Sequence, residues 1–143
     1  MKAENNIGGL LGKSSRLLSN NLNTDLNKLN LTVEQWSLLA VLWDTNGISQ
    51  KELQEALLKD KASINSLIKY LIKNGFITKK QSEHDKRSFL VSLTKKGEKV
   101  KEESIPLAMK NIMKAVDGIQ KEELDIFVKV TTQIIQNLTK DKK

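Results

Sequence analysis

The chain has 143 residues, a length that suits one domain with its own core, and its 38% hydrophobic content is ordinary for a globular protein. It contains no cysteine, which excludes disulfides, thiolate metal sites and a cysteine redox switch. The formal net charge of +7 equals the net charge of residues 59–102 alone, which contain twelve lysines or arginines and five acidic residues. This basic segment indicates either a solvated lysine-rich face or a surface that binds a polyanion such as DNA.

The N-terminal segment lacks the apolar run and the small-residue cleavage pattern of a signal peptide. The sequence also lacks a stretch near the ~18 apolar residues that a membrane-spanning helix needs. We therefore expect a cytoplasmic protein without membrane contact. Nothing in the sequence indicates a cofactor.

The first predicted helix covers residues 7–29, where the apolar residues fall on one face at helical spacing. This apolar stripe is long for packing within one small domain, so we expect it to pack on a partner helix. Thr32 and Gln35 form a capping-box pattern that opens a second helix, which is apolar almost all round and should be buried. We expect Trp36 and Trp43 of this helix to belong to the core rather than to a ligand pocket.

Two short helices joined by a tight turn follow, which is the outline of a helix-turn-helix. Ser49 and Glu52 form a second capping box that opens the first of these helices, and the second spans residues 61–74. Residues 76–80 and 88–93 have the composition and alternation of strands, and they predict a β-hairpin with a charged tip.

The remainder of the chain returns to helical spacing. A long helix is predicted from Thr94 to about Asp117, with a kink at Pro106. The last helix begins at Lys121 and has acidic residues in its first turn, which suits the helix dipole. The expected fold class is therefore mainly α with a small β-wing.

The helix at residues 61–74 divides into an apolar and a polar face. Its predicted core side consists of Ile64, Leu67, Ile68, Leu71 and Ile72, and Tyr70 falls on the opposite side. Small polar residues near its start could enter a major groove and hydrogen-bond base edges. The candidates for base contacts are Ser63, Asn65 and Ser66. The candidates for phosphate contacts, which add affinity but little specificity, are Lys61, Lys69, Lys73 and, in the hairpin tip, Lys86. An ordinary solvated helix would show the same pattern.

The hairpin tip at residues 83–87 contains Arg87, one of only two arginines in the chain. An arginine on a β-wing can enter a narrow minor groove, where the negative potential is enhanced. Asp85 could support this wing by a charge-assisted bond to the guanidinium. The alternative interpretation is a solvated charged turn.

Three apparent motifs are rejected. Residues 8–14 resemble a phosphate-binding loop, but the loop is one residue too short and follows no strand. His84 and Asp85 adjoin on an exposed turn, without the buried geometry of a catalytic pair. A lone histidine without clustered carboxylates makes no metal site. We therefore expect no enzyme active site.

Several stretches resemble the MarR family of bacterial regulators: residues 31–36, 50–53, 64–75 and, most specifically, 85–97. The last stretch has the family's D-x-R wing signature, an apolar strand and then L-T-x-x-G. The resemblance covers essentially the full chain. It implies a dimer formed by the terminal helices, with the helix at residues 61–74 in the major groove and Arg87 in the minor groove. Many relatives have an arginine where this chain has Ser66, a departure that bears on guanine readout.

The resemblance also implies a function. Members of the family usually repress transcription, and many release DNA when they bind small, often phenolic, molecules. We expect a sequence-specific DNA-binding transcriptional regulator, a repressor that acts as a homodimer on a pseudo-palindromic operator. The alternative is a dimeric small-molecule sensor or protein-interaction module without specific DNA binding. Residues 1–143 are expected to form a single domain, with a winged helix-turn-helix DNA-binding part at 32–94 and a helical dimerisation part at 7–29 and 95–139.

Overall fold

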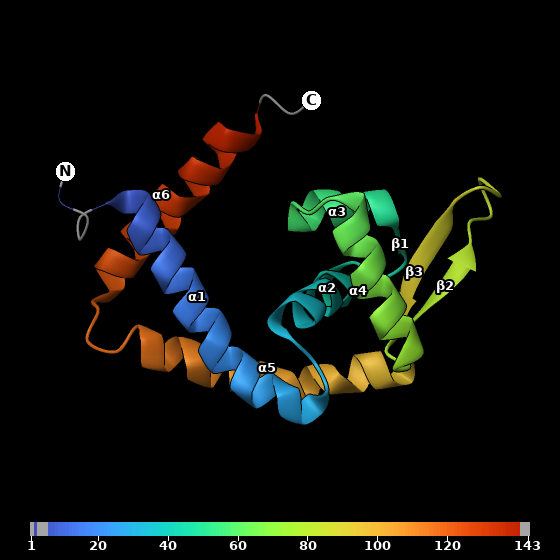
Figure 1. The fold of residues 1–143 in the computed structure, drawn as a ribbon, viewed down its shortest axis with the longest axis horizontal. Coiled ribbons are helices and arrows are strands. Elements are labelled where there is room, and N and C mark those ends of the chain that lie inside the picture. The colour runs from blue at the N-terminus through green and yellow to red at the C-terminus, as the bar shows by residue number, and fades with distance from the viewer. Residues whose placement is uncertain (1, 3–5, 141–143) are drawn as a thin grey trace. The chain divides into compact units, whose positions relative to one another are not determined.

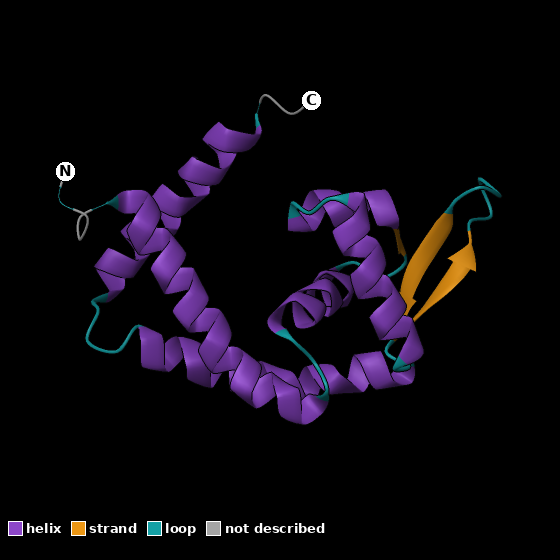
Figure 2. Cartoon of the chain, viewed as in Figure 1, coloured by secondary structure: helices purple, strands orange, loops and turns teal. Residues whose placement is uncertain are grey.

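The computed structural model describes Lys2 and residues 6–140, which form six α-helices, a short 3-10 helix and one sheet (Figure 1). The helices are α1 (Ile7–Leu26), η2 (Asn27–Leu29), α2 (Val33–Asp44), α3 (Gln50–Leu57), α4 (Lys61–Lys73), α5 (Lys95–Ala115) and α6 (Lys121–Thr139). The strands are β1 (Ile48–Ser49), β2 (Ile77–Gln81) and β3 (Phe89–Leu93). The predicted fold class, mainly α with a small β-wing, is confirmed (Figure 2).

The chain divides into two compact units, and the boundary along the sequence falls between Asn111 and Ile112. The first unit contains every element from α1 to β3 and most of α5, and the second contains the end of α5 and α6. The division into a DNA-binding part and a dimerisation part stays a prediction. No helix within the described part of the chain is long and apolar enough to cross a membrane.

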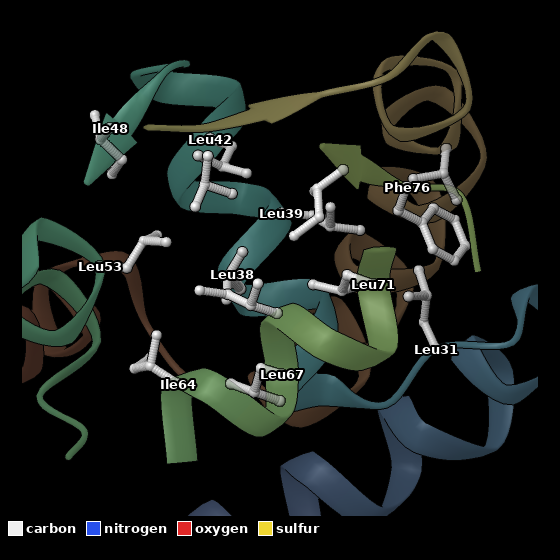
Figure 3. Close-up of a cluster of buried hydrophobic side chains, with 14 of the residues drawn as sticks. Leu31, Leu38, Leu39, Leu42, Ile48, Leu53, Ile64, Leu67, Leu71 and Phe76 are labelled. Atoms are coloured by element: carbon white, nitrogen blue, oxygen red, sulfur yellow. The ribbon is translucent and has the colours of Figure 1, made fainter. Parts of the chain in front are cut away.

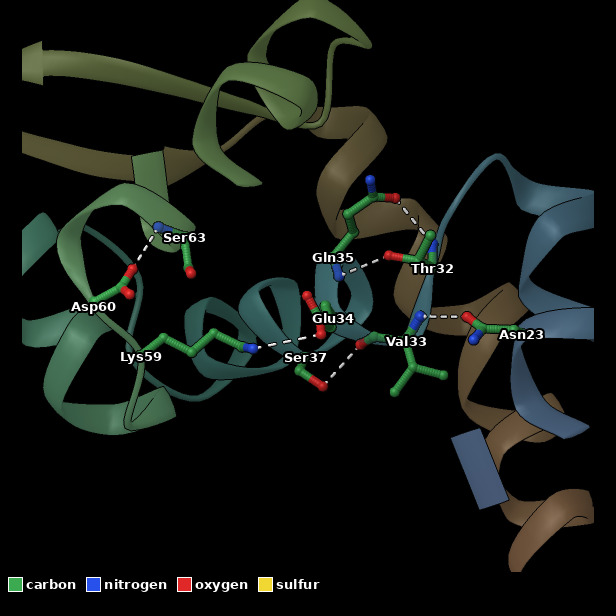
Figure 4. Close-up of polar contacts among 9 residues, drawn as sticks. All are labelled: Asn23, Thr32, Val33, Glu34, Gln35, Ser37, Lys59, Asp60 and Ser63. Atoms are coloured by element: carbon green, nitrogen blue, oxygen red, sulfur yellow. Dashed lines mark hydrogen bonds and ion pairs between the residues drawn. The ribbon is translucent and has the colours of Figure 1, made fainter. Parts of the chain in front are cut away.

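Local capping interactions start the helices where the sequence predicts them. At the start of α2, the Gln35 amide donates to Thr32 Oγ1 at 3.2 Å, and the Thr32 amide donates to Gln35 Oε1 at 2.9 Å (Figure 4). At the start of α3, Ser49 and Glu52 exchange the equivalent bonds at 3.1 and 3.2 Å. Each pair satisfies two backbone amides that a helix start leaves unpaired, so both starts are fixed by short-range contacts.

The sheet has the strand order β1-β3-β2, and both pairings are antiparallel. Strand β3 is central, because Val91 pairs with Ile48 of β1 on one side and with Lys79 of β2 on the other. The strands β2 and β3 form a hairpin that extends away from the helices and ends in a loop (Figure 2). This loop holds the charged tip that the sequence predicts.

The core is aliphatic apart from Phe76, and its largest contributions come from α2 and α4 (Figure 3). Three leucines of α2 and three apolar residues of α4 are at most 1% exposed: Leu38, Leu39, Leu42, Ile64, Ile68 and Leu71. Burying one such side chain contributes about 1.5–3 kcal/mol, so this cluster fixes α4 against α2.

Both tryptophans of α2 pack against this core, as predicted, and remain partly exposed. Their rings meet edge to face, with centroids 6.0 Å apart. The indole of Trp36 donates to Ser104 Oγ at 2.8 Å, and that of Trp43 donates to the Gly97 carbonyl at 2.9 Å. Because Gly97 and Ser104 belong to α5, these two bonds fasten this long helix to α2.

Candidate nucleic-acid interface

The start of α4 is fixed by Asp60, which is its N-cap residue. The Ser63 amide donates to Asp60 Oδ1 at 2.7 Å (Figure 4). Hydrogen bonds from the backbone and side chain of Ser63, with a smaller contribution from the Lys59 charge, lower the pKa of the Asp60 carboxyl. An ion pair of 3.5 Å joins Lys59 to Glu34 of α2 and ties the turn before α4 to the preceding helix.

The end of α4 is fixed by residues far away in the sequence. Lys96 Nζ donates to the Asn74 carbonyl at 2.8 Å and lies 4.5 Å from the centroid of the Phe76 ring. A cation at this place complements the negative end of the helix dipole. The Tyr70 hydroxyl donates to the Asn30 carbonyl at 2.6 Å. The expectation that Tyr70 lies on the outer face is therefore wrong, because this bond draws its partly buried ring toward the loop before α2.

The apolar face of α4 is confirmed except at its C-terminal end. Four of the five predicted core residues are buried: Ile64, Leu67, Ile68 and Leu71. Ile72 is 39% exposed, because it lies at the margin of the stripe and misses the core cluster. On the other side, the predicted contact residues Lys61, Ser63, Ser66, Lys69 and Lys73 are all exposed. Asn65 is partly buried, and its side chain forms no hydrogen bond within the described residues. Its amide is thus free for a ligand.

The wing tip is organised by Asp85, in a way that differs from the prediction. Its Oδ1 accepts from the Arg87 amide at 2.9 Å, and its Oδ2 accepts from Ser88 Oγ at 3.2 Å. No ion pair between Asp85 and the Arg87 guanidinium occurs in the part of the chain that the structure describes. Asp85 therefore supports the backbone of the turn. Lys86 and Arg87 are exposed at the tip, and neither forms an ion pair within the described residues.

A groove of about 590 Å³ lies between the start of α3, the start of α4 and the wing. It brings together two of the predicted contact residues, Lys61 and Arg87. The other six predicted contact residues do not line it. Lys51 of α3 and Lys79 of β2 also line the groove, and neither was predicted from the sequence. Lys51 precedes the basic segment, and the residue pattern of β2 does not show which strand face meets the helices.

The structure describes the residues of two apparent motifs, the phosphate-binding loop and the metal site. Residues 8–14 lie within α1, so the apparent phosphate-binding loop is helical. Among the described residues, no group of three or more His, Asp or Glu side chains could hold a metal ion. The candidate interface consists of cationic and small polar side chains on α3, α4 and the wing.

Comparisons with known proteins identify the family. The family model described as "MarR family" matches residues 31–89. The organic hydroperoxide resistance transcriptional regulator of Bacillus subtilis is 36% identical over 107 residues, which are 75% of this chain and 73% of that protein.

Solved structures agree over nearly the whole chain. A MarR-family transcriptional regulator of Listeria monocytogenes complexed with a 26-mer DNA superimposes with a TM-score of 0.89 at 28% identity, covering 99% of this chain and 92% of that one. A MarR protein of Peptoclostridium difficile gives 0.88 at 27% identity, covering 99% and 94%. This chain belongs to the MarR family of transcriptional regulators.

Proposed function

We propose that this regulator binds DNA sequence-specifically through α4 and the wing. The observation that supports this most directly is the exposed face of α4, where small polar residues precede lysines, beside a wing that presents Arg87. Both elements belong to one compact unit whose core and caps hold them in fixed relation. A similar protein, the Listeria monocytogenes regulator, is known in complex with DNA.

Each predicted contact residue has a role in this proposal. Ser63, Asn65 and Ser66 contact base edges in the major groove, where an asparagine amide suits adenine. Phosphate contacts come from Lys61, Lys69, Lys73 and Lys86. Arg87 enters the adjacent minor groove and favours A·T-rich flanks, where that groove is narrow.

We further propose that the protein acts as a homodimer. Three apolar residues of α1 are 46–65% exposed: Ile7, Leu10 and Leu17. In the second unit, α6 has no buried residue, and six of its apolar residues are 49–73% exposed: Ile126, Phe127, Val128, Val130, Ile135 and Leu138. A second copy would cover such surfaces. Two recognition helices would then meet successive major grooves about 34 Å apart on a pseudo-palindromic operator.

The proposal is tested by selecting bound duplexes from random or genomic DNA. The affinity for the selected duplex is then measured as the salt concentration is raised. A pseudo-palindrome bound tightly near 0.15 M salt would support a specific regulator. If no consensus emerges and the affinity collapses as salt rises, the binding is non-specific. A dimer without salt-dependent DNA affinity would instead favour a sensor or protein-interaction module.

Two variants test the individual roles. Arg87→Ala should weaken operator binding about tenfold, while Arg16→Ala, which removes the other exposed arginine, should leave it unchanged. Equal affinities for the two variants would contradict the wing assignment. Asn65→Ala should relax base preference at one position of the operator. A uniform loss over all sequences would argue against base readout by Asn65.

The same proposal includes the direction of regulation, which is repression, and the signal that ends it, which is an effector. We propose a cytoplasmic repressor without enzymatic activity that a small-molecule effector releases from DNA. The Bacillus subtilis relative is named for organic hydroperoxide resistance. This chain has no cysteine, so thiol oxidation cannot be its signal. A reporter under the selected operator should be silenced by the protein; activation of that reporter would overturn the repressor assignment.

A further inference from the structure

The groove between α3, α4 and the wing is strongly cationic. Four basic side chains line it, and none of its lining residues is acidic; the basic residues are Lys51, Lys61, Lys79 and Arg87. Within the described residues, none of the four forms an ion pair. Four like charges that face a common space repel one another, so the groove favours an anionic occupant.

We propose that this groove holds the DNA strand that separates the major from the minor groove, with Lys51 and Lys79 as its phosphate contacts. The inference rests on the proposed function and adds two residues to it. In a duplex, adjacent major and minor grooves are divided by the sugar-phosphate backbone of one strand. If α4 enters the major groove and Arg87 the minor groove, that backbone must pass between α4 and the wing. The space between them is the groove.

The lining of the groove suits a sugar-phosphate chain. Lys79 Nζ lies 5.6 Å from the centroid of the Phe89 ring, a contact that restrains the ammonium group on the wing side. The Phe89 ring is 47% exposed and offers an apolar surface beside the cations, as a deoxyribose would need. Gln50 also lines the groove, and its buried Nε2 has no hydrogen-bond partner within the described residues. A phosphate oxygen would give this donor an acceptor.

Phosphate contact differs from base contact in its salt dependence. Each phosphate that a lysine neutralises contributes about 0.9 to the slope of log K against log salt. The variant Lys51→Gln/Lys79→Gln should therefore lower the magnitude of this slope by about 1.8 for each DNA-bound protomer. Between 1 M and 0.15 M salt, a slope of 0.9 corresponds to about a fivefold change in affinity for each lysine. The loss should be equal on the operator and on a scrambled duplex, because phosphates are the same in both.

The measurement is fluorescence anisotropy with a labelled operator between 50 and 300 mM salt, on the full chain. The control Lys13→Gln/Lys110→Gln removes two exposed lysines that lie outside the groove, and it should retain the wild-type slope. Both groove lysines are exposed, so their replacement should leave the fold intact. Circular dichroism checks this for each variant.

The outcomes separate this inference from the proposed function. A reduced slope in the groove variant alone supports the inference. If wild-type protein prefers its operator and the groove variant keeps the control's slope, the inference is overturned and the proposed function stands. A loss confined to the operator would also overturn it, because the lysines would then contact bases. If wild-type protein has no operator preference, the proposed function fails first.

Discussion

Gly97 occupies a place in α5 where the structure leaves no room for a side chain. A Cβ built on it would lie 2.1 Å from the Phe76 carbonyl oxygen and 3.1 Å from Leu93 Cδ2. Real Cβ atoms essentially never come within 3.0 Å of another heavy atom, so the variant Gly97→Ala requires a shift of at least 0.9 Å, the difference between 3.0 and 2.1 Å. The closest atom belongs to the backbone, which cannot turn away as a flexible side chain can.

The cost of Gly97→Ala can be worked out from these contacts. Forcing a methyl group into a packed site costs typically 1–3 kcal/mol, with about 1 kcal/mol more for each hydrogen bond that the shift breaks. The Phe76 carbonyl accepts from the Thr94 amide at 3.0 Å, so this bond is at risk. The better helix propensity of alanine returns about 1 kcal/mol. With a steric cost of about 3 kcal/mol and one broken hydrogen bond, the free energy of unfolding should fall by about 3 kcal/mol after the gain in helix propensity is counted.

The assay is thermal unfolding followed by circular dichroism. An unfolding entropy of about 2.1 cal/mol/K per residue gives about 0.3 kcal/mol/K for a chain of this size, so Tm should fall by about 10 °C. The control is Gly9→Ala in α1, where the added Cβ would meet its nearest atom at an ordinary 3.7 Å. Its Tm should stay the same or rise. A fall of less than about 2 °C for Gly97→Ala, or an equal fall for both variants, would refute the steric argument.

Three further predictions concern the contacts that hold the interface. Lys96→Gln should lower the stability by about 1 kcal/mol, because it removes the charge over Phe76 and at the end of α4, whereas Lys95→Gln should have no effect; chemical denaturation compares the two. The folded-state pKa of Asp60 lies below its ordinary value of 3.8, so its carboxylate stabilises the fold above that pH, and the stabilisation is lost as the pH falls through the folded pKa. The Tm difference between the wild type and Asp60→Asn should therefore shrink between pH 5 and pH 3, and a constant difference would contradict this reasoning. Asp85→Ala should accelerate hydrogen exchange at the Arg87 and Ser88 amides with little change in Tm, whereas Glu83→Ala should leave this exchange unchanged. Equal exchange rates in the two variants would show that Asp85 does not stabilise the turn.

The features that sequence predicts well depend on short-range contacts. The capping boxes at Thr32 and Ser49 each involve partners three residues apart, and both form as expected. The hairpin and the helix-turn-helix follow from turn residues and periodicity in the same way. The family signature then allows the whole architecture to be anticipated from one stretch of the wing.

The features that sequence missed depend on contacts across the fold. Tyr70 turns inward because its hydroxyl meets the Asn30 carbonyl forty residues away. Lys96 counts as one more charge of the basic segment, yet it binds the end of α4. Lys51 lies outside that segment, and only the packing of α3 beside the wing brings it to the groove. A one-dimensional pattern shows which residues are charged but not which of them share a space.

The two indole bonds to α5 give the protein an intrinsic optical probe. Trp36 and Trp43 are its only tryptophans, and both donate to this one helix. Indole emission is sensitive to the loss of such a bond, so the native ultraviolet fluorescence reports on a single junction, that between α2 and α5. A ligand or a duplex that moves α5 relative to α2 should change the emission of the unlabelled wild-type chain. A titration in a cuvette could then screen for effectors before any operator is known.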